Sequence, residues 1–217
     1  MADASVSEGN YRGRRIPVGL KIAYSVFVAI LAPDYWRFYG PANFLWFCDI
    51  ALLLTVVALW WESAFLASMQ LVAVFLGQMV WLADFLSRLI TGHFLTRWTH
   101  YMFRPDIPLP ARLFSLYHGG MPFLLGWLVW RLGYARRAWL AQTVLAWVVL
   151  PVCYLCTDPR RTLNAVFGPS GEKQQDWMAP ELYLLLLMVF YPVCIFFPSH
   201  LLFCWVFRAK TSHSGEW

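Results

Sequence analysis

The chain has 217 residues, of which 60% are hydrophobic and only 13% are charged. Soluble globular domains contain about 45–50% apolar and about 25% charged residues, so this composition excludes an ordinary soluble domain and favours a membrane protein. The formal net charge of +5 does not indicate nucleic-acid binding, because the arginines lie between apolar runs, as they do at the ends of membrane spans.

Six apolar segments approach the roughly 20 residues that a membrane-spanning helix needs. In chain order, they are expected at 16–32, 41–60, 64–89, 110–131, 138–157 and 179–206. Lys21 lies near the start of the first, where its long side chain can reach the interface. Pro192 and Pro198 are expected to kink the sixth. The sequence therefore predicts an all-α, polytopic integral membrane protein with six transmembrane helices.

The predicted organisation is one six-helix domain over 16–207, with an N-terminal tail at 1–15 and a C-terminal tail at 208–217. We expect the first span to be retained, because no small-x-small cleavage site follows the polar first residues. The basic clusters GRRIP and YARRAW fall on the same side of the predicted spans as the N-terminus. Positive charge in short loops favours the cytoplasm, so both termini are expected there.

The connection at about 91–110 is partly amphipathic, and we expect it to lie in the membrane interface. The five cysteines do not form the even set of a secreted disulfide framework. The spacing Cys153-x-x-Cys156 has no second pair, so it indicates neither zinc nor redox chemistry. No cofactor motif is present, and we predict neither a metal site nor a soluble cofactor.

Three chemically active side chains interrupt the apolar runs at a similar depth. Cys48 and Asp49 follow Pro41 by seven or eight residues, and His118 follows Pro110 by eight. At about 1.5 Å per residue, helices that begin at these prolines would place all three roughly 10–12 Å below one surface. An ionisable group inside a span costs a few kcal/mol and indicates function by default. The alternative for His118, a structurally satisfied buried histidine, carries equal weight.

Four further polar residues are expected in the same half of the membrane, each with a structural role as its simpler interpretation. Asp84 and Arg88 are spaced i, i+4 and are expected to pair. Gln78 is expected to bond a neighbouring helix, and Asn43 to cap the second span.

Three stretches, "FLWFCDIALLLTVVALW", "LYHGGMPFLLGWLV" and "VLPVCYLCTDPRRTLNAVFGPSG", resemble blocks of the YwaF-type bacterial integral membrane proteins. The resemblance covers about residues 41–200 and implies six helices in a bacterial inner membrane. More distantly, that family is similar to the androgen-induced and androgen-dependent membrane hydrolases of fatty-acid esters and to a lipid acyltransferase. The wider resemblance implies a nucleophile at Cys48 that faces His118. Trp46 stands where the family usually has a histidine, which puts activity in question.

The sequence thus leads to a membrane lipid hydrolase or acyltransferase that uses Cys48 and His118 near the outer leaflet. Asp49, Asn43 or Gln78 would orient the imidazole or stabilise the oxyanion. The alternative is a non-enzymatic assembly factor, complex subunit or lipid-binding module. Its partners would be membrane lipids, another membrane protein or a second copy of the chain. A small transporter or channel is disfavoured, because the predicted spans place almost no polar residues at the midplane.

Overall fold

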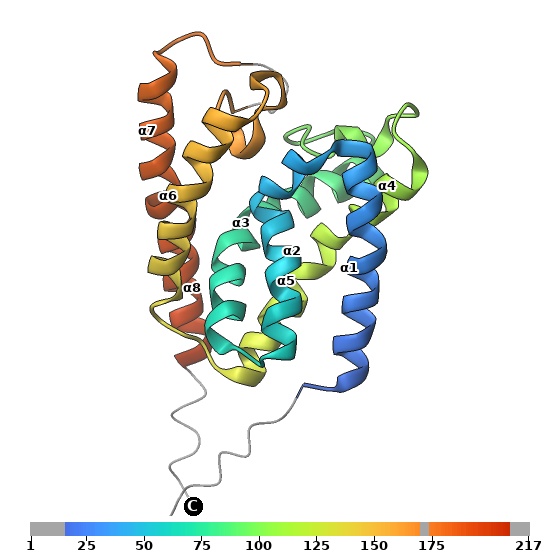
Figure 1. Ribbon diagram of the computed structural model, residues 1–217, viewed down its shortest axis with the longest axis vertical. Helices are drawn as coiled ribbons and strands as arrows, with labels where there is room; N and C mark the ends of the chain where they lie inside the picture. The colour runs from blue at the N-terminus through green and yellow to red at the C-terminus, as the bar shows by residue number, and fades with distance from the viewer. Residues whose placement is uncertain (1–15, 170–173, 209–217) are drawn as a thin grey trace, which may run out of the picture.

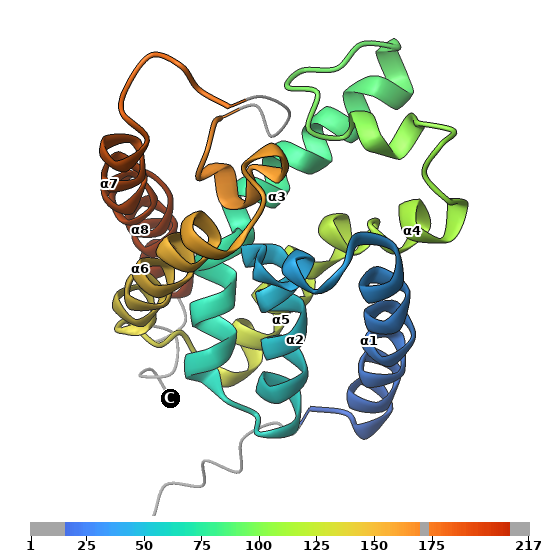
Figure 2. The ribbon, with the colours of Figure 1, turned by 45° about the horizontal axis from the view of Figure 1, so that its top comes forward.

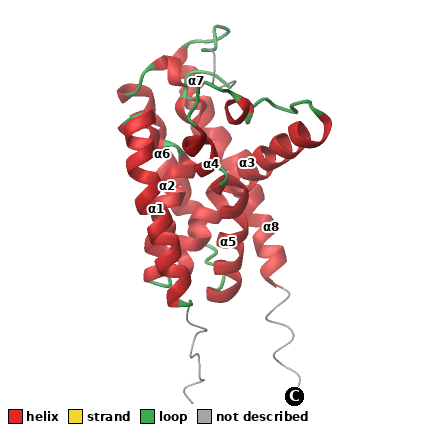
Figure 3. Ribbon diagram, turned by 90° about the vertical axis from the view of Figure 1, so that its right-hand side faces the viewer, coloured by secondary structure: helices red, strands yellow, loops and turns green. Residues whose placement is uncertain are grey.

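The computed structural model describes residues 16–169 and 174–208, and within them the regular structure is entirely helical (Figure 3). The longer helices are α1 (Val18–Tyr39), α2 (Phe47–Trp60), α3 (Ala64–Thr91), α4 (Leu109–Phe114), α5 (Tyr117–Leu132), α6 (Ala138–Cys156), α7 (Pro180–Phe190) and α8 (Phe197–Arg208). The short 3-10 helices are η1 (Pro41–Leu45), η2 (His100–Phe103), η3 (Pro159–Arg161) and η4 (Leu163–Ala165), and a π-helical turn, η5 (Tyr191–Phe196), joins α7 to α8.

In the part of the chain that the structure describes, four helices are long and apolar enough to cross a membrane: α1, α3, α6 and the continuous rod Pro180–Phe207. The other two rods of the bundle, α2 and α5, have 14 and 16 residues, which is about 21 Å and 24 Å of helix. The all-α prediction is confirmed, and four of the six expected spans meet the length requirement. In the sixth, the expected disruption by proline takes the form of the π-helical turn, which contains Pro192.

The second and fourth expected spans are interrupted near one end. Trp46 has an extended backbone (φ −60°, ψ 137°) and separates η1 from α2. Ser115 and Leu116 separate α4 from α5. The expected uninterrupted helices from Pro41 and Pro110 are therefore wrong. As a result, Cys48, Asp49 and His118 lie in the first turns of α2 and α5.

Helix α3 is the centre of the bundle and packs against α2, α5, α6 and α8 (Figure 1). Residues 67–74 are all buried, which requires neighbours on every side of the helix. The peripheral helices instead expose apolar side chains, such as Val26 and Ile30 on α1 and Val144 and Val148 on α6. Such continuous apolar surfaces are consistent with an integral membrane protein.

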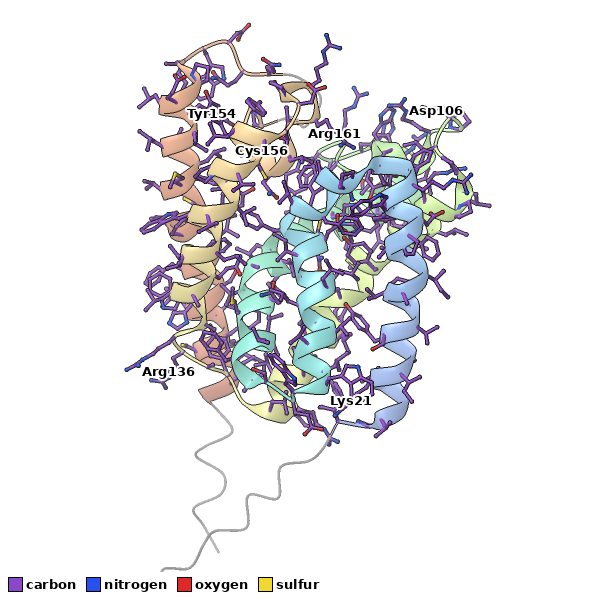
Figure 4. All side chains as sticks on the ribbon, viewed as in Figure 1. Lys21, Asp106, Arg136, Tyr154, Cys156 and Arg161 are labelled. Carbon is purple, nitrogen blue, oxygen red and sulfur yellow. The ribbon has the colours of Figure 1, made fainter. Side chains whose placement is uncertain are left out.

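The described chain begins and ends at the same end of the bundle, which is the lower end in Figure 1. Figure 4 places Lys21 and Arg136 at this lower end, and Asp106 and Arg161 at the opposite, upper end. Lys21 is buried there in an ion pair with Glu62, at 2.7 Å. The tails expected at 1–15 and beyond Arg208 lie outside the described residues.

Candidate functional site

A buried carboxylate, Asp49, lies in the first turn of α2 at the upper end of the bundle. The Asn43 amide donates a hydrogen bond to its Oδ2 at 2.7 Å, and the Tyr117 hydroxyl donates one to its Oδ1 at 2.9 Å. Within the described chain Asp49 forms no ion pair. Its stabilisation comes instead from these two donors and from the positive end of the α2 macrodipole.

The start of α2 is fixed by Asn164, from the segment that follows α6. The Asn164 side chain accepts a hydrogen bond from the Phe47 amide at 3.0 Å and donates one to the Leu45 carbonyl at 2.7 Å. These bonds bracket Trp46 and satisfy an N–H that the helix start would leave without a partner. Asn164 itself has a positive φ of 48°, a conformation that asparagine tolerates better than most residues. It therefore holds the turn that carries Cys48 and Asp49.

His118 lies in the first turn of α5, with Nδ1 2.7 Å from the Ser115 carbonyl oxygen. A carbonyl oxygen only accepts, so Nδ1 must carry the hydrogen, and in the neutral imidazole Nε2 keeps its lone pair. The ring stacks on Tyr117 and Trp81, with centroid distances of 4.1 Å and 5.2 Å. The geometry leaves His118 oriented and able to accept a proton at Nε2.

Cys48 and His118 do not form the direct pair that the resemblance implies. No hydrogen bond joins their side chains in the part of the chain that the structure describes. The half-buried Cys48 lies near Tyr117, but the described residues show no hydrogen bond between these two side chains either. Tyr117 directly contacts the other two predicted catalytic residues, because it bonds Asp49 and stacks on His118.

A second group of hydroxyls surrounds the histidine. The Trp81 indole donates to the Tyr101 hydroxyl at 3.2 Å, and the Tyr35 hydroxyl lies 2.7 Å from Ser115 Oγ. Tyr101 belongs to η2, between the spans, where burial raises the pKa of its hydroxyl above the usual value. This hydroxyl stays protonated at neutral pH. The upper end of the bundle therefore holds a connected polar cluster rather than one isolated histidine.

Asp84 and Arg88 have separate roles and do not form the expected ion pair. The Asp84 carboxylate accepts four backbone N–H groups and one hydroxyl from the loop after α3, contributed by Leu95, Thr96, Arg97 and Thr99. The Arg88 guanidinium lies over the rings of Phe94 and Phe103, at 5.0 Å and 5.6 Å. The loop offers Asp84 more donors than one arginine could, so both residues organise this loop and neither enters the site.

Gln78 is buried in α3, and neither its side-chain nitrogen nor its oxygen has a hydrogen-bond partner among the described residues. The bond to a neighbouring helix that the sequence suggested is therefore absent. Asn43 lies in η1, before α2, and its side chain reaches forward to Asp49 instead of capping the helix backbone.

The structure makes two residues central to which the sequence assigned no role: Tyr117, which was only expected in the same half of the membrane as the other polar groups, and Asn164. Tyr117 directly precedes His118, and its place in the LYHGG stretch was the available signal. Asn164 is 117 residues away from the amide that it binds. No local pattern connects the two positions, so only the fold reveals this contact.

An apolar cavity of about 340 Å³ adjoins the polar cluster, between α1, α2, α4 and α5. The ring of Tyr117 forms part of its wall, whereas Cys48 and His118 do not line it. Among the described residues, no group of three or more His, Cys, Asp or Glu side chains is placed to hold a metal ion.

No known protein family, curated protein or solved structure matches this chain. The resemblance to the YwaF-type proteins therefore stays a prediction, and the argument for function depends on the geometry.

Proposed function

We propose that the protein is an integral membrane enzyme of lipid esters, a hydrolase or an acyltransferase, with six crossings and its site in the upper half of the bundle. The observation that carries the proposal is the arrangement around Asp49. Among the described residues, a buried carboxylate without a cation partner is bonded by Tyr117, which also lies near Cys48. Buried acids without counter-charges in membrane proteins are associated with function.

In the first step, the Cys48 thiol gives its proton to Asp49 through the Tyr117 hydroxyl. The thiolate attacks the ester carbonyl carbon, a carbon–sulfur bond forms, and the carbon–oxygen bond of the ester breaks. The departing alcohol recovers the proton from Asp49 by the same route. This route rests on the 2.9 Å hydrogen bond from Tyr117 to Asp49 and on the nearness of Cys48 to Tyr117, because a general base can act through one intermediary.

In the second step, His118 acts as the base. Its Nε2 takes a proton from water in a hydrolase, or from a hydroxyl group of an acceptor lipid in an acyltransferase. The resulting oxygen nucleophile attacks the thioester, and the proton returns to the departing Cys48 thiolate. The hydrogen bond from Nδ1 to Ser115 orients the ring for this role.

One observation favours a second candidate, a lipid-binding or assembly module without catalysis. Cys48 and His118 make no direct hydrogen bond, whereas nucleophile–base pairs usually lie within hydrogen-bond reach. On this alternative, the polar cluster stabilises the upper end of the bundle and reacts with nothing.

The release of fatty acid or of acylated acceptor from phospholipid vesicles that contain the purified protein separates the two candidates. The enzyme proposal expects Cys48→Ala and His118→Ala each to lower turnover by about 10²-fold or more. Cys156→Ala, at an exposed free cysteine of the upper end (Figure 4), serves as the matched control and should leave turnover unchanged. Turnover that survives both site variants would rule out the proposed chemistry.

A further inference from the structure

The apolar cavity beside Tyr117 lies on the bilayer-facing side of the site. Helix α1 stands at the edge of the bundle (Figure 2), and the cavity separates it from α5. Leu113, Leu116 and Gly120 belong to its wall and are exposed on the outer surface of the described structure. Because α1 is itself a candidate membrane span, an opening beside it would face lipid where α1 crosses the bilayer.

The wall offers a ligand no free polar group from its two tyrosines. The Tyr24 hydroxyl donates to the Leu52 carbonyl at 3.1 Å, and the Tyr117 hydroxyl donates to Asp49 at 2.9 Å. The rest of the wall is leucine, phenylalanine, methionine and glycine. A cavity without polar partners does not retain water and favours an apolar occupant.

The dimensions of the cavity suit a hydrocarbon chain. The volume of about 340 Å³ lies within the range of about 300–1,000 Å³ typical of small-molecule sites. Along α5 the wall extends from Tyr117 to Leu124, a distance of about 10 Å along the helix axis. Its upper end adjoins the Asp49–Tyr117 pair, and its lower end adjoins Tyr24 on α1, in the interior of the bundle.

We propose that this cavity binds one acyl chain of a membrane lipid, which enters sideways from the bilayer between α1 and α5. The chain lies along α5, and its polar end points toward Tyr117 at the upper end. The part of this proposal that places an ester at the polar end of the chain rests on the proposed function. Binding of the chain itself requires no chemistry at Cys48.

Gly120 provides a direct test, because a Cβ built on it meets nothing within 4 Å and would project into open space. Gly120→Leu fills the cavity from a helical position without a backbone clash. Gly126, on the same helix, also has open space around an added Cβ but does not line the cavity. Gly126→Leu is therefore the matched control.

The experiment uses the full chain in vesicles that contain a phospholipid with a photoreactive diazirine in one acyl chain, followed by mapping of the cross-linked peptides. Cross-links are expected near Phe27 on α1 and near Leu124 on α5. Gly120→Leu should lower them about ten-fold, Gly120→Ala should lower them partially, and Gly126→Leu should leave them unchanged.

Cross-links that are absent from these two helices, or that Gly120→Leu and Gly120→Ala leave undiminished, would overturn the cavity as an acyl site. If Gly120→Leu does not fold, the graded loss in Gly120→Ala decides the question. Cross-links that depend on Gly120, in a protein that turns over no lipid, would support the acyl site while rejecting the proposed enzyme. Lipid turnover without cross-links that depend on Gly120 would support the proposed enzyme and reject the acyl site.

Discussion

At the scale of single residues, Tyr117 connects the parts of the candidate site. Its hydroxyl bonds Asp49, its ring stacks on His118, and the same ring forms part of the cavity wall. A carboxylate that loses a donor inside a low-dielectric bundle has little water to replace it. The stability of this region and its chemistry therefore depend on the same hydroxyl.

Tyr117→Phe removes that hydroxyl and leaves Asp49 with the single donor from Asn43. We expect the free energy of unfolding to fall by about 1–3 kcal/mol, the cost of a buried polar group that loses a partner. Denaturant titration of the protein in detergent micelles measures the change. Tyr183→Phe is the control, since the Tyr183 ring is buried but the described structure shows no hydrogen bond from its hydroxyl. Equal effects of the two substitutions would contradict the role given to Tyr117.

The sequence singled out a small set of residues that the fold brings to one region, but it could not assign their partners. Cys48, Asp49 and His118 were noticed because active groups are rare in apolar runs, and the fold does bring their helix starts together through Tyr117. The pairing of Asp84 with Arg88 was wrong, because i, i+4 spacing says nothing about a loop that folds back to offer its amides.

At the scale of elements, the starts of α2 and α5 and the loop after α3 determine the geometry. The apolar runs continue across the breaks at Trp46 and at Ser115–Leu116, so hydropathy could not predict these breaks. A broken helix and an unbroken one have the same composition. The break at Trp46 depends on Asn164, whose side chain bonds the backbone on both sides of it. Distant contacts of this kind have no signal in a single sequence.

Asp84→Asn tests whether the Asp84 carboxylate holds the loop after α3 in place. The amide keeps one acceptor oxygen but presents an NH₂ group where Oδ2 now accepts from the backbone and hydroxyl of Thr99. We expect hydrogen exchange of the amides at 95–99 to accelerate by roughly ten-fold or more while the helices stay protected. Hydrogen–deuterium exchange with mass spectrometry measures this directly.

Asp106→Asn is the matched control in the same region. The Arg104 side chain holds the pKa of Asp106 below its usual value, so the pair persists at neutral pH and is lost as the pH falls. Both partners are exposed, and surface pairs contribute little to stability. Unchanged exchange at 95–99 in Asp84→Asn, or equal acceleration in Asp106→Asn, would contradict the anchoring role.

At the scale of the whole molecule, composition and hydropathy predicted most of the architecture. Apolar runs of the right length identified the helical rods, and the described ends of the chain do lie at one end of the bundle (Figure 1). Hydropathy could not predict that α2 and α5 are shorter than the other rods, nor that a cavity separates α1 from α5. Those features depend on packing between helices that are distant in the sequence.

The measurement that tests the central claim most directly is the mass of the Cys48 peptide after incubation of the protein with phospholipid vesicles. We expect an acyl group on Cys48 that hydroxylamine removes, and more of it in His118→Ala, because His118 serves the second step. A Cys48 peptide that stays unmodified in both proteins, with no lipid turned over, would contradict the enzyme and leave the fold as a lipid-binding or assembly module.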